Sequence, residues 1–191
     1  YPEILILEYG IQKPGDMEYL LSIAKPSIAI AGAIGDTPAH IEFFKDTEAL
    51  ASEKVRLLHA VSAMGFIVVN GDDPRMMKMS EKTLAHRFTF GFAKNATVQI
   101  KNFEYLSTED HPVGIAFNIF YGENSAAFRF ESTVGKSTAY AVASGVAVGV
   151  IFGGNILRIA QNILAHYHPP KHRMILLRIR EGVYAIDDTY N

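Results

Sequence analysis

The stretch that most constrains the fold runs from residue 25 to residue 54, KPSIAIAGAIGDTPAHIEFFKDTEALASEK. Residues 27–31 form a short apolar run, which is typical of a buried strand. Glycines, an aspartate and a proline between residues 32 and 38 then break the chain into a loop. His40 lies in this loop, and a helical pattern that carries Lys54 follows. Because open α/β sheets bind ligands where a polar loop follows a buried strand, this stretch predicts a ligand-binding edge.

The same alternation of apolar runs and helical segments continues through the first half of the chain. Two further buried strands are expected, at residues 4–8 and 66–69. Helices are expected at residues 14–24, 47–63 and 74–83, with Thr47 as the cap of the second. Strands that alternate with helices predict a parallel sheet with right-handed crossovers, and therefore an α/β fold.

The pattern changes after residue 86. Four segments have strand composition with partial alternation and are separated by short turns: 87–92, 97–105, 114–121 and 126–131. We expect them to form an antiparallel set beside the parallel sheet. Two helices should follow, at residues 136–152 and 155–166, and then a last hairpin of residues 174–179 and 183–186.

Composition limits the possible functions. The chain has 191 residues, a net charge of −2 and no cysteine. The charge argues against nucleic acid held by bulk electrostatics, and the missing cysteines exclude a disulfide framework and suit a reducing cytoplasm. The longest apolar segment, residues 138–152, is about 15 residues long, whereas a membrane span needs roughly 20. A cytoplasmic protein with a buried helix there, and no membrane span, is expected.

Three residues of the first half could form a metal site. Glu8 ends a predicted buried strand, where a carboxylate normally needs a partner or a metal, although it could also cap a helix or face solvent. His40 could be a ligand or simply a hydrogen-bonding residue in a loop. Lys54 could be an ordinary surface lysine of a helix, with Glu53 beside it.

A second polar group, Asn70, Asp72 and Asp73, follows the strand at residues 66–69. Asparagine can read an adenine edge, and aspartate can hold ribose hydroxyls or metal-bound water. The alternative is an Asx-turn that caps the helix beginning at Pro74.

The segment VGKST, residues 134–138, resembles a phosphate loop only superficially. A phosphate loop needs a second glycine five residues before Gly135, and that position is Phe130. We therefore interpret GKST as unrelated to phosphate binding, and the sequence contains no GxxxxGK[ST] motif.

Several of these motifs together resemble a known family. The segments concerned are residues 5–35 (LILEYGIQKPGDMEYLLSIAKPSIAIAGAIG), 38–44 (PAHIEFF), 49–54 (ALASEK), 68–74 (VVNGDDP) and 185–191 (AIDDTYN). They are similar to the central ATPase domain of the Mur ligases, especially the subgroup that adds D-Ala-D-Ala to the cell-wall precursor. The resemblance implies an α/β fold with a mostly parallel P-loop-type sheet flanked by helices and an added antiparallel section.

The resemblance also implies a domain organisation. Residues 1–183 would be the central domain without its N-terminal P-loop part, and residues 184–191 would begin the C-terminal ligase domain. Both ends of the chain look cut, because it enters a strand pattern at once and stops inside a motif. We therefore expect a piece of a longer polypeptide that is inactive in ligation by itself.

The resemblance assigns roles to named residues. Glu8, His40 and Lys54 would bind Mg²⁺, with Lys54 carbamylated and His40 and Lys54 serving catalysis. The residues expected near ATP are Asn70, Asp72, Asp73, Arg173, Asp187 and Asn191. Arg173 matches the arginine of a GRM motif whose glycine is replaced by His172. The chain departs from the family at Ala33, Ser137 and Thr138, where the family usually has asparagine, histidine and asparagine.

The implied activity is that of an ATP-dependent ligase of peptidoglycan synthesis. ATP would phosphorylate the carboxylate of a UDP-muramoyl peptide, and the amine of D-Ala-D-Ala would attack the acyl phosphate, with Mg²⁺ offsetting negative charge. Two alternatives stay open. One is a relative with the same ATPase domain, such as a folylpolyglutamate synthase or another Mur ligase. The other is a degenerate, non-catalytic nucleotide-binding or scaffold domain.

Overall fold

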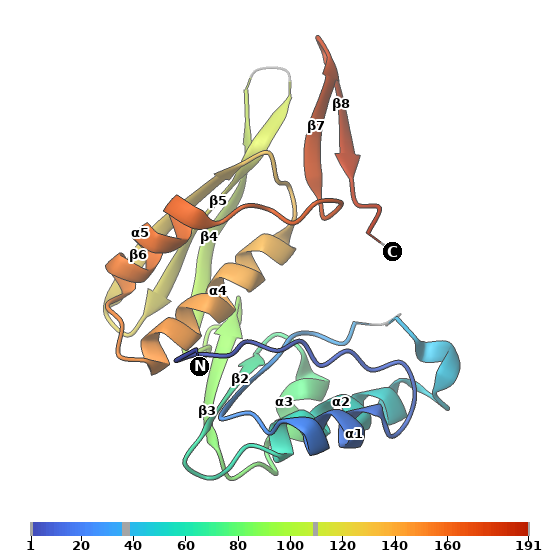
Figure 1. Ribbon diagram of the computed structural model, residues 1–191. Coiled ribbons are helices and arrows are strands. Elements are labelled where there is room, and N and C mark those ends of the chain that lie inside the picture. Colours follow the sequence, from blue (N-terminus) through green and yellow to red (C-terminus); the bar gives the residue numbers. More distant parts are fainter. Residues whose placement is uncertain (1, 36–38, 109–110, 191) are drawn as a thin grey trace. The chain divides into compact units, whose positions relative to one another are not determined.

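The computed structural model describes residues 2–35, 39–108 and 111–190. The chain divides into two compact units, residues 1–87 and residues 88–191. Each unit has its own strands and covering helices (Figure 1).

The first unit follows the predicted alternation of helices and strands. Its elements are α1 (Asp16–Ile23), β1 (Ile28–Ala31), the 3₁₀ turn η1 (Ile41–Phe43), α2 (Thr47–His59), β2 (Phe66–Asn70) and α3 (Pro74–Ser80). β1 and β2 pair in parallel, from Ile28 opposite Phe66 to Ala31 opposite Val69. Helix α2 packs against α1, α3 and β1. The parallel α/β arrangement predicted for this part of the chain is therefore confirmed.

The core of the first unit lies between α2 and the strands. Leu50, Ala51 and Leu58 of α2 have no solvent exposure, and neither has Ile67 of β2. Their positions along α2 place them on one side of the helix, as an amphipathic helix requires. Val68, the next residue of β2, is equally buried, which is typical of a strand covered on both faces.

The start of α2 differs from the sequence prediction by one residue. Asp46, and not Thr47, is the N-cap, because Asp46 has extended backbone and its Oδ1 accepts a hydrogen bond from the N–H of Ala49 at 2.8 Å. Thr47 is the first helical residue. Both residue types are good caps, so composition alone does not choose between them.

A side chain of α2 also caps α1. Oε1 of Glu53 accepts hydrogen bonds from the backbone N–H groups of Gly15 at 2.9 Å and Met17 at 3.1 Å. Gly15 has a φ of 92°, which suits glycine far better than other residues. Glu53 is 5% exposed, and its other oxygen lies 3.2 Å from Nε of Arg56. The predicted helix start near Pro14 is therefore stabilised by a carboxylate from a different helix.

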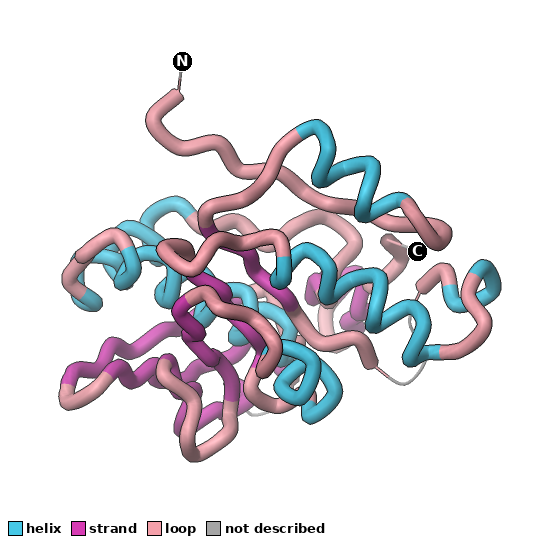
Figure 2. Tube along the Cα trace, turned by 90° about the horizontal axis from the view of Figure 1, so that it is seen from below, coloured by secondary structure: helices cyan, strands magenta, loops and turns pink. Residues whose placement is uncertain are grey.

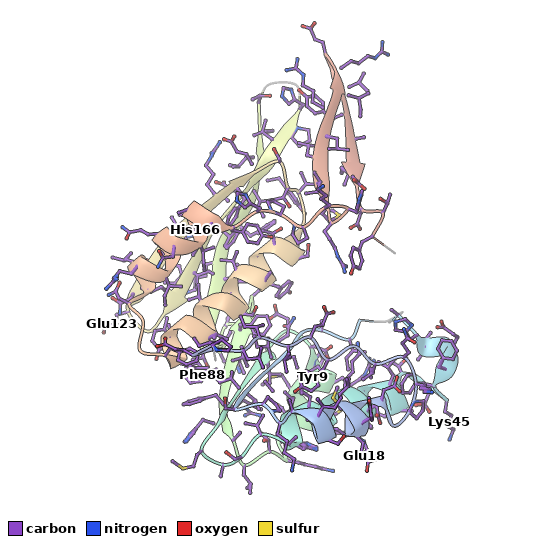
Figure 3. All side chains as sticks on the ribbon, in the orientation of Figure 1. Tyr9, Glu18, Lys45, Phe88, Glu123 and His166 are labelled. Atoms are coloured by element: carbon purple, nitrogen blue, oxygen red, sulfur yellow. The ribbon has the colours of Figure 1, made fainter. Side chains whose placement is uncertain are left out.

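The strand predicted at residues 4–8 does not form. The exposed fractions of the residues Ile4, Leu5, Ile6 and Leu7 range from 48% to 89%. No described strand pairs with this segment, which is drawn as loop near the N-terminus in Figure 2. An apolar run has strand propensity, but a strand also needs a hydrogen-bonded neighbour. Regular contacts begin with Tyr9, labelled in Figure 3, whose hydroxyl donates to the carbonyl of Ala24 at 2.7 Å.

The second unit is mainly a strand layer covered by two helices. Its elements are β3 (His86–Gly91), which begins in the last residues of the first unit, β4 (Val98–Ser107), β5 (Pro112–Tyr121), β6 (Asn124–Glu131), α4 (Lys136–Ile151), α5 (Ile156–His166), β7 (Ile175–Arg180) and β8 (Val183–Asp187). The strands β4, β5 and β6 pair antiparallel, as predicted. β7 and β8 form a separate antiparallel hairpin, which contacts the segment after β6 through a bridge between Thr133 and Ile175.

One strand direction was predicted wrongly. β3 pairs with β4 in parallel, with Phe90 opposite Val98 and Gly91 opposite Gln99. Just before this register, the Thr97 N–H donates to the Thr89 hydroxyl at 2.9 Å. Strand composition does not encode direction, because the backbone of the short connection decides whether the chain reverses.

The helix predicted from the longest apolar segment is α4. Ala139, Ala143 and Ala147 have no solvent exposure, and α4 packs against β4 while α5 packs against β6 (Figure 1). Small residues allow the helix to approach the strands closely. Among the described residues, no helix is both long and apolar enough to cross a bilayer.

Candidate functional site

The loops that follow β1 and β2 are joined to each other. Oδ2 of Asp73 accepts a hydrogen bond from the N–H of Ile34 at 2.8 Å, and Nη1 of Arg75 lies 3.4 Å from the carbonyl oxygen of Gly35. Because β1 and β2 are parallel, both loops leave the same edge of the pair. Residues 71–73, which follow β2, therefore lie at the same edge as Ile34 and Gly35, which follow β1.

The polar residues at the end of β2 and directly after it form hydrogen bonds that stabilise the local backbone. Oδ1 of Asn70, a side chain that is 3% exposed, accepts from the N–H of Asp72 at 2.9 Å. Oδ1 of Asp73 accepts from the N–H groups of Arg75 at 2.9 Å and Met76 at 3.0 Å, which caps α3. The Asx-turn and cap, left open as an alternative, are thus present. Contact of Asn70, Asp72 or Asp73 with a nucleotide stays a prediction.

Lys54 has an environment that suits chemistry at its amine. It lies on α2 and is half-buried, and burial lowers the pKa of its ammonium below the ordinary lysine value of 10.5. A lower pKa increases the fraction of neutral amine, which is the form that reacts with carbon dioxide. Carbamylation of Lys54 stays a prediction.

The other two candidate metal ligands are exposed. Glu8 lies in the irregular segment before α1, and His40 precedes η1 with a φ of 66°, in the left-handed region. No group of three or more histidines, aspartates and glutamates gathers into a metal site within the described ranges. The convergence of Glu8, His40 and Lys54 therefore stays a prediction. In chemistry, the Glu8 carboxylate and a carbamate on Lys54 would fit Mg²⁺, which prefers oxygen ligands, better than the His40 imidazole does.

The second unit holds a compact polar cluster around the turn after β8. Oδ1 of Asp187 accepts from the Thr189 hydroxyl at 2.7 Å and from the Thr189 N–H at 3.3 Å. Oδ2 lies 2.9 Å from Nδ1 of His172. The hydroxyl of Thr189 first, and then the imidazole of His172, hold the pKa of Asp187 below the usual aspartate value.

The neighbouring residues tie the same turn to the segment before β7. Oδ1 of Asp188 accepts from the Met174 N–H at 3.2 Å, and the Tyr190 N–H donates to the His172 carbonyl at 3.1 Å. The guanidinium of Arg173 lies 3.7 Å from the centre of the Tyr190 ring, a cation–π contact. Arg173 and Asp187, both predicted near ATP, are thus brought into one cluster. Asn191 lies outside the described residues.

The GKST segment is built into the second unit as a helix start. Gly135 is the N-cap of α4, and the Thr138 hydroxyl lies 3.1 Å from that of Thr133 in a buried pair. Nζ of Lys136 lies over the ring of Phe92, 5.2 Å from its centre. A lysine held against an aromatic ring agrees with the interpretation that this segment is no phosphate loop.

Two residues with defined roles were not singled out by sequence reasoning. Glu53 caps a helix 38 residues away, and no local pattern signals such a contact. His172 contacts Asp187. The sequence clue to its role was that a histidine replaces the glycine of the GRM motif, and the structure shows a φ of 63° at this position, a value that glycine adopts most readily.

These features describe an α/β chain with polar loops at the ends of parallel strands, an arrangement suited to ligand binding. Residues 2–148 match the model of the Mur ligase middle domain, so the chain belongs to this family.

Three relatives show how far the similarity extends. The chain is 28% identical to the UDP-N-acetylmuramoyl-tripeptide–D-alanyl-D-alanine ligase of Mycobacterium leprae over 99% of its own length, and it spans 37% of that relative. In fold it is similar to MurF from Acinetobacter baumannii, with a TM-score of 0.78, 20% identity, and coverage of 95% of this chain and 38% of that one. It is equally similar to the MurF ligase from Thermotoga maritima in complex with ADP, with a TM-score of 0.78, 23% identity, and coverage of 94% and 39%.

Proposed function

We propose that the chain is part of an ATP-dependent ligase that joins D-Ala-D-Ala to a UDP-muramoyl tripeptide in peptidoglycan synthesis. The observation that carries this proposal is the similarity to the Mycobacterium leprae ligase along 99% of the chain. The similarity includes the turn after β8, where His172 contacts Asp187 and the Tyr190 N–H by hydrogen bonds and Arg173 lies over the Tyr190 ring.

The proposed reaction has two steps. The terminal carboxylate of the muramoyl peptide attacks the γ-phosphorus of ATP, which forms an acyl phosphate and releases ADP. The amine of D-Ala-D-Ala then attacks the acyl carbon, the C–O bond to phosphate breaks, and the amine loses a proton. Both steps depend on placing charged groups close together, so positioning and charge compensation carry most of the catalysis.

Residues of the first unit would manage this charge. The neutral Lys54 amine takes up carbon dioxide and releases a proton, which replaces a cation by a carbamate anion on α2. With Glu8 and His40 it would hold Mg²⁺, which when bound offsets the negative charge of the phosphates and the carboxylate. Asn70, Asp72 and Asp73 would lie near the nucleotide at the β1–β2 edge.

Residues of the second unit would contact the nucleoside. The Asp187 carboxylate, whose pKa is lowered by its bonds to Thr189 and His172, would accept a ribose hydroxyl, and Asn191 would approach the adenine. We assign residues 1–183 to the central domain and residues 184–191 to the start of a C-terminal ligase domain, which places β8 at their junction. From these substrates and this reaction we propose that the whole polypeptide is cytoplasmic.

The test is phosphate release by the full-length polypeptide that carries these residues. With Mg-ATP and UDP-muramoyl tripeptide, release should depend on D-Ala-D-Ala and yield the extended peptide. Release that depends on D-glutamate or on a folate substrate would instead favour another member of this ATPase group. If no substrate stimulates release, the non-catalytic alternative is correct.

A matched pair of lysine variants tests the role of Lys54. Lys54→Ala should lose most ligation, whereas Lys45→Ala, an exposed lysine just before α2 that Figure 3 labels, should keep it. Equal turnover of the two variants would remove the carbamate from the proposal.

A further inference from the structure

The carboxylate of Asp187 is held on both of its oxygens by donors of this chain. Nδ1 of His172 is 2.9 Å from Oδ2, while the hydroxyl and N–H of Thr189 bind Oδ1 at 2.7 and 3.3 Å. The His172 side chain is 56% exposed and that of Asp187 only 18%. The imidazole is therefore the more exposed partner of this pair.

The donors of this chain occupy most of the acceptor positions of the Asp187 carboxylate. An ionised carboxylate has about four, two on each oxygen. Thr189 fills both positions of Oδ1, and His172 fills one position of Oδ2. Within residues 2–35, 39–108 and 111–190, one position on Oδ2 is left without a donor, beside the imidazole. The arrangement suits the acceptance of a single further hydroxyl in a direction that His172 determines.

The backbone at His172 is fixed by the same turn. Its carbonyl accepts from the Tyr190 N–H at 3.1 Å, and its φ of 63° lies in the left-handed region, where non-glycine residues are uncommon although histidine is found more often than most. Glycine would adopt this conformation without strain but would supply no donor. The side chain is therefore the part of His172 that a glycine could not replace.

We propose that His172 is a positioning residue for nucleotide binding, which orients the Asp187 carboxylate so that the open position on Oδ2 accepts one ribose hydroxyl of ATP. This inference rests on the proposed function, since it needs Asp187 to contact the nucleotide. The groups that face the imidazole are the Asp187 carboxylate and the Thr189 hydroxyl, while the guanidinium of the adjacent Arg173 lies over Tyr190. The neutral imidazole with its proton on Nδ1 donates as the imidazolium does, so the positioning does not require a charged ring.

The experiment measures Mg-ATP affinity and the KM for D-Ala-D-Ala in the full-length polypeptide. His172→Gly should weaken ATP binding about tenfold, the usual scale for a hydrogen bond to a charged group, and leave the KM for D-Ala-D-Ala unchanged. His172→Asn should restore ATP affinity to within about threefold, because Nδ2 of asparagine branches at the same position as Nδ1 and asparagine tolerates positive φ. His172→Asp introduces a side chain of the same shape as asparagine but without a hydrogen-bond donor, and it should bind ATP as weakly as the glycine variant.

Controls separate this inference from the proposed function. Ser132→Gly changes another exposed residue with a left-handed φ, 62°, and should leave ATP affinity unchanged. Asp187→Asn should weaken ATP binding, and adding His172→Gly to it should cause little further loss.

Three results would overturn the inference. The first is that His172→Gly or His172→Asp binds ATP as tightly as the parent protein. The second is that Ser132→Gly loses as much ATP affinity as the two His172 variants. If either result is found while Asp187→Asn does weaken ATP binding, the proposed contact of Asp187 with the nucleotide stands and only the role of His172 is wrong. The third result is that Asp187→Asn binds ATP normally, in which case both the nucleotide contact of this turn and the role of His172 are wrong.

Discussion

Replacing Glu53 by alanine should selectively destabilise the start of α1. The carboxylate accepts two backbone hydrogen bonds, at 2.9 and 3.1 Å, from Gly15 and Met17, and the glutamate is 5% exposed. Hydrogen bonds to a charged group contribute roughly 1.5–3 kcal/mol each, but these two share one oxygen, so about 3 kcal/mol is expected for the pair. The Arg56 contact adds less than about 1 kcal/mol, because the arginine side chain is 54% exposed.

Amide hydrogen exchange over residues 13–23 measures this effect directly. A loss of about 3 kcal/mol corresponds to exchange roughly a hundredfold faster at the α1 amides. Glu53→Gln keeps a neutral acceptor and should cost about half as much. Glu48→Ala is the matched control, since its carboxylate lies on the same helix with 68% exposure and a 4.0 Å contact to Arg75. If Glu53→Ala and Glu48→Ala gave the same exchange rates, the capping argument would be refuted.

Three further outcomes are expected. Because folding lowers the Lys54 pKa, the unfolded chain binds more protons than the folded chain between the folded-state pKa and 10.5, so the free energy of unfolding should rise with pH through that window. In urea titrations at several pH values, Lys54→Met should abolish this rise, and an unchanged dependence on pH in the variant would contradict the prediction. Asp73→Ala should cost about 1–2 kcal/mol in the same titrations through loss of the α3 cap, and a cost near zero would show the cap to be unimportant. The 191-residue chain alone should not catalyse ligation, and Lys136→Ala should leave ATP hydrolysis by the full-length polypeptide unaltered. Turnover that copurifies with the 191-residue chain would mean that the phosphate site was misplaced and that GKST is the first candidate for it.

Local patterns predicted the elements of the fold well. Apolar runs gave β1 and β2, and the polar residues after them gave the correct loops, because strand burial and loop chemistry are properties of a few adjacent residues. Residues 4–8 carry the same pattern and yet form no strand within the described structure, since pairing is a property of a neighbour and not of the run itself. The direction of β3 was missed for a similar reason.

The candidate site was predicted less completely. The pattern left two readings of Asn70 and Asp73 open, contact with a ligand or an Asx-turn with a helix cap. The contacts show the turn and the cap, and contact with a ligand stays a prediction. Glu53 and His172 act on residues 38 and 15 positions away, at Gly15 and Asp187, and such contacts exist only once the chain has folded. The lowered pKa of Lys54 likewise follows from burial, which a helical pattern indicates only roughly.

The two oxygens of Asp73 carry a consequence for ligand binding at the β1–β2 edge. One oxygen caps α3 and the other holds the Ile34 N–H, 39 residues earlier in the chain. With two acceptor positions on each oxygen, the Arg75 and Met76 amides fill Oδ1, whereas the Ile34 amide fills one position of Oδ2. A nucleotide hydroxyl that binds Oδ1 must therefore displace an amide of α3, but one that binds Oδ2 can share it with Ile34. Faster amide exchange at the first turn of α3 on nucleotide binding would show that the ligand had taken Oδ1, and unchanged exchange there would leave Oδ2 as the oxygen that binds it.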